Sequence, residues 1–380
     1  MSLKRKSSEG GKIEKGRYGK NKNRSVDRPE GKEEKRENVT EDPWARQLLP
    51  ESLAKSVKTV YNTVTMAIPG SILRSAQTKE LRSYLVGQIA RAAAIHEIDE
   101  IVVFVDSAYE ASAPDLDKTP SVICCRLLQY LECPSYLRKA LFPVHSDLAL
   151  AGLLPPLDTP HHMRREDVSL YREGVVVENK VSADGCYVNV GLSSEAFIGR
   201  HLRPGVRVTV ELDEPEVGTN SGNSRANSSG ASRKIPTGNA VAPTQPRVKH
   251  GLYWGYQTRL AKTFGDIFTE CPHKGGYDIL VGNSTKGIDV DTIPDSKLEE
   301  IKQGTSANQG KHILIVFGGS VGIENCVDAD ETLATPGRDA ETLFDLWTNL
   351  CPSEGSKQVR TEELVLAGLS GLKRVIKKML

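Results

Sequence analysis

The sequence predicts an α/β protein that carries an inserted small β-barrel, and three features of the chain indicate it. A strand, a long amphipathic helix and a second apolar strand follow one another between residues 58 and 106, which is the pattern of a βαβ unit. Helical periodicity disappears between residues 154 and 260, where short β-like runs take its place. Beyond residue 277, apolar runs end in turns of small residues, as parallel strands do where they border a ligand site.

The α/β part is expected to begin near Val57. Residues 58–69 are β-branched and alternate in polarity, so they predict a strand. Residues 79–96 place their apolar side chains at helical spacing and predict a long helix. The apolar run 101–106 is typical of a buried parallel strand, and residues 120–133 predict a second helix.

The β-like runs in the middle predict an OB-like barrel over residues 154–256. The α/β domain is then discontinuous and comprises residues 57–153 and 257–380. Inside the barrel, residues 217–247 are rich in Ser, Asn and Gly and predict a disordered surface loop. The predicted barrel strands are 174–177, 186–190, 206–212 and 252–256.

The C-terminal part again has the pattern of an α/β fold. A helix is predicted at 261–268 and an amphipathic helix at the end of the chain. Three strands are predicted between these helices, at 277–282, 312–317 and 343–351. Each ends in a loop of small residues, at 282–287, 318–319 and 352–356. Because the carboxyl ends of neighbouring parallel strands meet at one edge of a sheet, we expect these loops to form a cleft.

Composition narrows the class of protein. The chain has 380 residues with a formal net charge of +1, and no apolar run approaches the roughly 20 residues that a bilayer requires. Its seven cysteines include no Cys-x-x-Cys pair, so a structural zinc site and a disulfide framework are both disfavoured. We therefore expect no membrane association, no bound metal and a reducing compartment.

The N-terminal segment is strongly basic. Residues 1–24 hold nine Lys or Arg residues against two Glu, with few apolar residues between them. Such a segment cannot bury enough surface to offset its ordering entropy, so residues 1–56 are predicted to be a disordered tail. It is either a nuclear or nucleolar address, a phosphate-binding arm, or a solvated tail without a specific partner.

The predicted cleft lacks the usual phosphate-binding motifs. There is no Gly-x-x-x-x-Gly-Lys-Ser/Thr sequence, and residues 318–322 do not fit the Gly-x-Gly-x-x-Gly frame. Neutral loops with free backbone groups suit a nucleoside, whose base edge main-chain groups can read.

Several motifs at these loops resemble those of the SPOUT superfamily of RNA methyltransferases. Residues 316–319 are similar to its first knot loop, and 282–287 are similar to the loop before it. Residues 355–363 resemble the Gly-x-x-x-(Ile/Val)-Arg-Thr-Glu-Thr signature of bacterial ribosomal-RNA uridine N-3 methyltransferases. Longer runs, at 69–73, 131–134, 160–164 and 251–256, resemble a eukaryotic branch that includes an animal centromere- and spindle-associated member.

The resemblance implies a C-terminal trefoil knot that binds S-adenosylmethionine, and a homodimer packed through the knot. It implies an S-adenosylmethionine-dependent RNA methyltransferase acting on ribosomal RNA, with uridine N-3 as the favoured target. With the basic tail, it predicts a location in the nucleus and, within it, in the nucleolus. The alternative is a catalytically weak, knotted, dimeric RNA-binding or scaffold protein at the nucleolus or mitotic spindle.

The resemblance also implies site residues, carried over by motif. The expected cofactor-binding residues are Lys286, Gly318, Gly319, Asn349, Cys351, Gly355, Val359 and Thr361. Arg360 is a candidate catalytic residue or anion anchor. The helix dipole favours acidic residues at a helix start, so an arginine at this position is expected to have a function. Arg91 is the second catalytic candidate, since its helix is similar to the one where ribose-methylating relatives place an arginine; the alternative is a surface ion pair.

The expected RNA-binding residues lie in and around the predicted barrel. Tyr253, Trp254, Tyr256 and Arg259 are candidates for base stacking and phosphate contact, although the aromatic residues would equally fill a small core. Arg164 lies close to two adjacent histidines that are poorly spaced for a metal ion, so this segment is expected either to face RNA or to form a loop.

Overall fold

The computed structural model describes residues 61–107, 110, 113–182, 184–213, 235–304, 310–352 and 355–380. The predicted basic tail and the first residues of the predicted strand 58–69 therefore lie outside the described residues.

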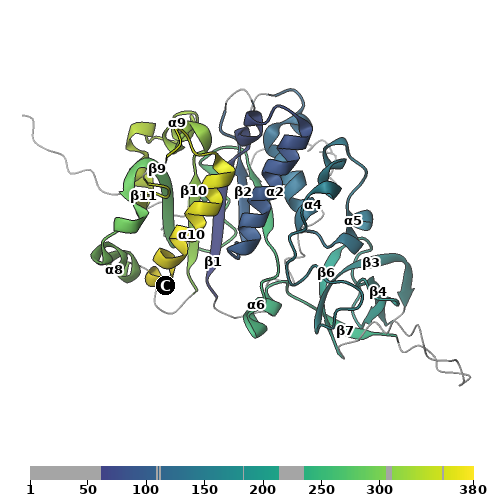
Figure 1. Cartoon of the computed structure of the whole chain (residues 1–380). Helices are drawn as coiled ribbons and strands as arrows, with labels where there is room; N and C mark the ends of the chain where they lie inside the picture. Colours follow the sequence, from purple (N-terminus) through teal and green to yellow (C-terminus); the bar gives the residue numbers. More distant parts are fainter. Residues whose placement is uncertain are drawn as a thin grey trace, which may run out of the picture.

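A parallel sheet of six strands runs through the molecule (Figure 1). In spatial order its strands are β11 (Leu346–Asn349), β9 (Ile279–Asp289), β10 (His312–Phe317), β1 (Thr63–Pro69), β2 (Glu100–Phe104) and β8 (Gln257–Ala261). Every neighbouring pair is parallel, so all six carboxyl ends lie along one edge. The order shows that strands far apart in sequence become neighbours: β1 pairs with β10, and β9 lies between β10 and β11.

Helices cover both faces of this sheet, which explains why its strands are apolar throughout rather than alternating. One face packs against α2 (Lys79–Ile95), α4 (Pro120–Glu132), α8 (Asp295–Gln303) and α10 (Thr361–Met379) (Figure 1). The other face packs against the short helices α7 (Asp266–Thr269) and α9 (Ile323–Asp328). Short 3-10 helices complete the connections, at Gly70–Ser75, Leu116–Lys118, Ser146–Leu148, Ala151–Leu153, Val290–Thr292, Gly319–Val321 and Gly337–Leu343.

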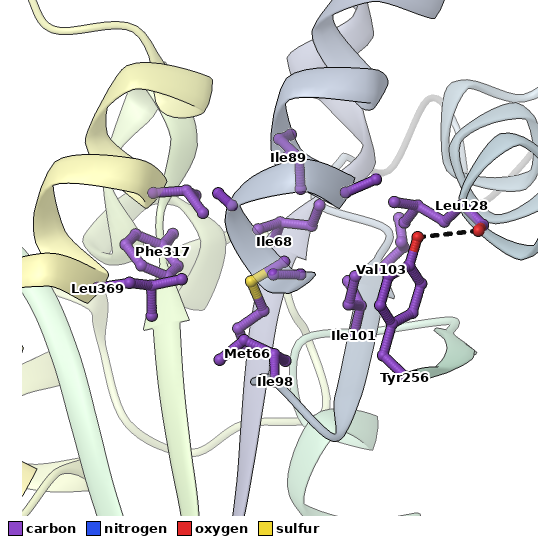
Figure 2. Close-up of a cluster of buried hydrophobic side chains, with 14 of the residues drawn as sticks. Met66, Ile68, Ile89, Ile98, Ile101, Val103, Leu128, Tyr256, Phe317 and Leu369 are labelled. Carbon is purple, nitrogen blue, oxygen red and sulfur yellow. Dashed lines mark hydrogen bonds between the residues drawn. The ribbon is translucent and has the colours of Figure 1, made fainter. Parts of the chain in front are cut away.

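The larger core lies beneath α2 and α10. Met66 and Ile68 of β1 point to this face, where Ile89 of α2 and Leu369 of α10 meet them (Figure 2). Ala67, between Met66 and Ile68, belongs to the cluster on the opposite face. The alternation along one strand thus assigns neighbouring side chains to two separate cores.

A closed five-stranded barrel lies between α5 (Ser135–Leu141) and β8 in the chain. Its strands, in order around the barrel, are β3 (Tyr171–Ser182), β4 (Gly185–Asn189), β5 (Ala196–Ile198), β7 (Thr237–Val241) and β6 (Arg207–Leu212). The pair β5 and β7 is parallel, and the other pairs are antiparallel. Alternate residues such as Val188, Ile198 and Val210 are fully buried and fill the interior.

A buried polar cluster joins the barrel to the α/β part. Arg207 of β6 places its two terminal nitrogens 2.6 and 2.9 Å from the carboxylate oxygens of Glu132 in α4. Its Nε donates to Glu173 of β3 over 2.7 Å. Tyr136 of α5 adds a hydrogen bond from its hydroxyl to the Glu173 carbonyl, at 2.7 Å.

The structure confirms the βαβ unit, the two early helices, the strands near 312–317 and 343–351, and the final helix. Two other predictions are wrong. Residues 252–256 are not a strand but an irregular connection between α6 (Gln245–His250) and β8. Residues 257–261 form strand β8, and in place of the predicted helix 261–268 there is only the single helical turn α7 at Asp266–Thr269.

Two loop predictions need correction as well. The predicted loop 217–247 contains β7 and the start of α6 at its C-terminal end, while residues 214–234 lie outside the described residues. Strand β9 does not end at residue 282 but continues to Asp289. Among the described residues, no helix has the length and apolar character of a membrane span.

Candidate functional site

The candidate site lies at the carboxyl ends of β9, β10 and β11, which are neighbours in the sheet. The residues after β10 form a glycine-rich loop that leads into α9, and those after β11 lead into α10. The predicted loop 282–287 is part of strand β9, where it forms a bulge. Gly282 pairs with Trp347, but the next residue, Thr348, pairs with Ile288, so five residues of β9 are set out from β11 as a bulge.

The loop after β10 requires glycine at each turn. A Cβ at Gly318 would collide with the backbone nitrogen of Ile323. Gly319 has φ +62°, and a Cβ there would lie 2.8 Å from Cγ of Pro69 at the end of β1. Gly322, with φ +83°, starts α9. The loop is therefore a close approach of backbone to backbone, of the kind that presents main-chain donors to a ligand.

Two asparagine side chains organise the loop after β11. Asn283, in the β9 bulge, accepts a hydrogen bond from the Leu350 backbone N–H at 3.2 Å. Asn349 folds over its own turn and accepts from the Cys351 N–H at 3.1 Å. The structure thus brings the predicted residues Asn349 and Cys351 beside the β9 bulge.

An ion pair connects the β9 bulge to α9. The ammonium of Lys286 lies 3.2 Å from Oε1 of Glu324, and the Ser284 hydroxyl donates to the same oxygen at 2.9 Å. Burial would raise the pKa of Glu324, but backbone and side-chain hydrogen bonds, with Lys286, hold it below its usual value. The result is an ionised carboxylate between the β9 bulge and α9, with Lys286 itself largely exposed.

Gly355 to Thr361 connect this edge to α10. Gly355 is exposed, and a Cβ there would meet no atom within 4 Å. Val359 is half-buried and Thr361 is buried at the first turn of α10. Arg360 is the exposed N-cap residue; its backbone N–H donates to Glu363 at 3.1 Å, which leaves its guanidinium on the surface. Glu363 therefore caps the start of α10.

Arg91 does not share this edge within one chain. It lies near the C-terminal end of α2, which leads to the start of β2 and so to the opposite edge of the sheet. Its guanidinium donates to the Leu157 carbonyl and, at 3.4 Å, to that of Pro156. These contacts tie α2 to the segment that precedes the barrel.

The predicted RNA-binding aromatic residues are buried away from the barrel surface. Tyr253 and Tyr256 donate to the carbonyls of Ile98 and Leu128, at 2.7 and 3.0 Å (Figure 2 shows the second bond). Trp254 donates to Glu173 at 2.6 Å. All three side chains are at most 7% exposed, which contradicts the prediction that they stack on RNA bases.

The two predicted RNA-binding arginines differ from each other. Arg259 is held in an ion pair with Glu100 at 2.9 Å, and its other nitrogens donate to main-chain carbonyls of α7 and to Tyr277. Arg164 is exposed in the segment before β3, so its contact with RNA stays a prediction.

Sequence reasoning missed Asn283, Ser284 and Glu324. The available signal for Glu324 was its position two residues after Gly322, in the first turn of a helix that starts at the glycine loop. The adjacent His161 and His162 both point to the Glu132 carbonyl, at 2.9 and 2.6 Å, rather than to a common ion. Within the described ranges, no cluster of three or more His, Cys, Asp or Glu is placed to hold a metal.

The chain is similar to known RNA methyltransferases. Residues 63–372 match the family described as "Putative RNA methyltransferase". The chain is 42% identical to the 28S rRNA (uridine-N(3))-methyltransferase of Drosophila melanogaster, over 82% of this chain and 62% of that protein. It is 43% identical to the human 28S rRNA (uridine-N(3))-methyltransferase, over 82% of this chain and 77% of that protein. Because the family match spans both the barrel and the loops of the site, this protein belongs to that family of RNA methyltransferases, within the SPOUT superfamily whose motifs its sequence carries.

Proposed function

We propose that the protein transfers the methyl group of S-adenosylmethionine to N-3 of a uridine in large-subunit ribosomal RNA. The observation that carries this proposal is the convergence of the β9, β10 and β11 loops at one sheet edge, in a chain whose relatives are named for that reaction. The family match includes all three loops.

The residues at this edge fit the methyl donor. Backbone groups that lie close to a nucleoside can bind it. The glycines after β10 allow such a close approach of the main chain, because a Cβ at these positions would collide with neighbouring residues. The donor carries a positive sulfonium and an amino group, which suit the ionised carboxylate of Glu324. Gly318, Gly319, Asn349, Cys351, Gly355, Val359 and Thr361 would hold the donor, with Lys286 beside them.

The role of this chain is to position the reactants and exclude water. S-adenosylmethionine supplies an electrophilic methyl group when bound. Arg360, exposed at the start of α10, is suited to bind the donor's carboxylate or an RNA phosphate.

The barrel gives the RNA a second surface. Its strand order and its parallel β5–β7 pair support an OB-like fold, whose second and third strands commonly face nucleic acid. On that side a hollow of about 840 Å³ is lined by Tyr187, Asn189 and residues 192–195. The Tyr187 and Phe197 rings lie 5.4 Å apart and are half-buried. We infer that this surface, rather than Tyr253 to Tyr256, contacts unpaired RNA.

The assembly proposed is a homodimer packed through a trefoil knot, located in the nucleus and concentrated in the nucleolus. Exposed apolar side chains on two adjacent helices support a packed partner, namely Leu81 and Tyr84 of α2 and Leu366 of α10. Light scattering at micromolar concentration checks the dimer. A monomer would contradict it.

The proposed function is tested by calorimetry and by genetics. We expect the purified protein to bind S-adenosylmethionine, and we expect deletion of its gene to remove 3-methyluridine from large-subunit rRNA. Cofactor binding without any loss of modified nucleoside would instead support a scaffold that binds RNA without modifying it.

A further inference from the structure

An acidic pair, half-buried Asp106 and buried Glu110, lies just beyond the carboxyl end of β2. The Ser71 hydroxyl donates to Oδ2 of Asp106, and the Ser121 backbone N–H donates to Oε1 of Glu110 at 2.8 Å. Glu110 is only 1% exposed. Among the residues that the structure describes, the other oxygen of each carboxylate, Asp106 Oδ1 and Glu110 Oε2, is buried without a hydrogen-bond partner. A buried acceptor without a donor is unfavourable, so this pair is suited to receive one from a ligand.

The pair lies close to residues 318–322, the glycine-rich loop after β10 that is proposed to bind the methyl donor; we call this segment the donor loop. A Cβ at Gly319 would lie 2.8 Å from Pro69 and 3.7 Å from Ile72, so this loop packs on the turn that follows β1. Ser71, which holds Asp106, belongs to the same turn. Cys326 of α9, whose thiol donates to the Gly318 carbonyl of the donor loop, is also close enough to Asp106 to feel its charge, so Asp106 lies beside the donor loop.

A basic hollow on the same turn offers a place for the RNA backbone. Arg74, Arg82 and Lys118 line a hollow of about 60 Å³. Arg74 also reaches Ser107, the neighbour of Asp106, at 3.5 Å. Cations around a small hollow suit one phosphate group, which would fix the position of the adjacent nucleotide.

The electrostatics around Asp106 favour proton uptake by its carboxylate. Burial raises the pKa of Asp106, and the like charge of Glu110 raises it further, against the hydrogen bond from Ser71. Three thiols interact with the pair: Cys124 and Cys125 with Glu110, and Cys326 with Asp106. Burial raises the pKa of the Cys124 thiol to about 12 and those of Cys125 and Cys326 well above their usual value, so all three are neutral.

This inference rests on the proposed methyl transfer to uridine N-3. We propose that Oδ1 of Asp106 accepts the N3 proton of the target uridine, while Ser71 orients the carboxylate and the basic hollow holds a neighbouring phosphate. The N3–H bond breaks toward Asp106, and the freed electron pair forms the N3–CH3 bond. The S–CH3 bond breaks with its electrons left on sulfur, and the proton then passes from Asp106 to water.

The test is single-turnover methylation of rRNA from a deletion strain by full-length Asp106→Asn protein. General-base catalysis is typically worth about 10²- to 10⁴-fold, so we expect the rate to fall at least about 100-fold while S-adenosylmethionine affinity is retained. A rate within about threefold of wild type would overturn the proposal. The matched control is Asp295→Asn, which removes an exposed carboxylate paired with Lys378 and should retain the wild-type rate.

A second variant keeps the test decisive if Asp106→Asn is poorly folded. Ser71→Ala removes a hydrogen bond to the charged form of Asp106, so the midpoint of the pH–rate profile should move to higher pH. A merely structural role would lower the amount of active protein without moving that midpoint, and an unmoved midpoint would therefore reject proton acceptance by Asp106. If the wild-type protein makes no 3-methyluridine, the proposed function itself has failed, which is a separate outcome.

Discussion

The buried polar cluster between the barrel and the α/β part allows a quantitative prediction of the stability lost in Arg207→Met. Arg207 neutralises two buried carboxylates through three hydrogen bonds, at 2.6 and 2.9 Å to Glu132 and 2.7 Å to Glu173. Removal of the cation leaves both carboxylates in the interior with only neutral donors and His161 beside them. Loss of one partner from a buried ion pair costs about 3–5 kcal/mol, so we expect the free energy of unfolding to fall by that amount.

The pH dependence of this loss follows from the same contacts. Burial alone would raise the pKa of Glu132, but Arg207 holds it far below its usual value, and the pKa of Glu173 is lowered in the same way. Their stabilising contribution is therefore present above the unfolded-state pKa and is lost as the pH falls through the folded-state pKa. In the variant both acids can protonate on folding, so the difference from wild type should shrink toward acidic pH.

Urea unfolding followed by tryptophan fluorescence measures the effect, because the Trp254 N–H donates to Glu173 inside the junction. The matched control is Lys378→Met, which removes the exposed ion pair with Asp295 and should cost about 0.5 kcal/mol or less. A loss below about 1 kcal/mol for Arg207→Met, or a loss that does not change with pH, would refute the reasoning.

The remaining predictions concern other parts of the molecule. Trp254→Phe removes the donor to buried Glu173 and should cost about 1–3 kcal/mol in unfolding free energy, while RNA affinity in a filter-binding assay stays unchanged; weakened RNA binding in folded protein would restore the stacking role. Gly319→Ala forces a Cβ to within 2.8 Å of Pro69 at φ +62°, so calorimetry should show S-adenosylmethionine binding at least about tenfold weaker, unlike Gly152→Ala, where a Cβ meets nothing within 4 Å. Burial, with the charge of neighbouring His161, lowers the pKa of His162 to about 4, so stability should fall as the pH drops from about 6.5 toward 4. His162→Gln should flatten that slope in urea titrations, and an unchanged slope would assign it to other groups.

Local patterns were sufficient for much of the α/β part. Helix α2 was predictable because its apolar residues recur at helical spacing. The structure adds its cap, Thr78, whose hydroxyl accepts from the Leu81 N–H at 3.3 Å. Strands β2 and β10 were predictable because burial on both faces produces continuous apolar runs. The glycines of the donor loop were identifiable because backbone that approaches backbone this closely excludes a Cβ.

The features that the sequence did not predict depend on contacts between distant parts of the chain. Residues 252–256 have the aromatic composition of a strand, yet their hydroxyl and indole groups find partners in β3, α4 and the Ile98 carbonyl, which draws the segment into an irregular path. The small residues of the β9 bulge predict a loop, because nothing local shows that Ile288 resumes pairing with β11. Asp106 and Glu110 belong to no motif, and only the packing of the β1 turn brings them beside the donor loop.

The central claim is tested most directly by incubating the purified protein with S-adenosylmethionine that carries an isotopically labelled methyl group and with large-subunit rRNA from a deletion strain. Mass spectrometry of the digested RNA should then show labelled 3-methyluridine at one position, and none when the donor is omitted. Label in another nucleoside, in protein alone, or nowhere despite donor binding would contradict the account.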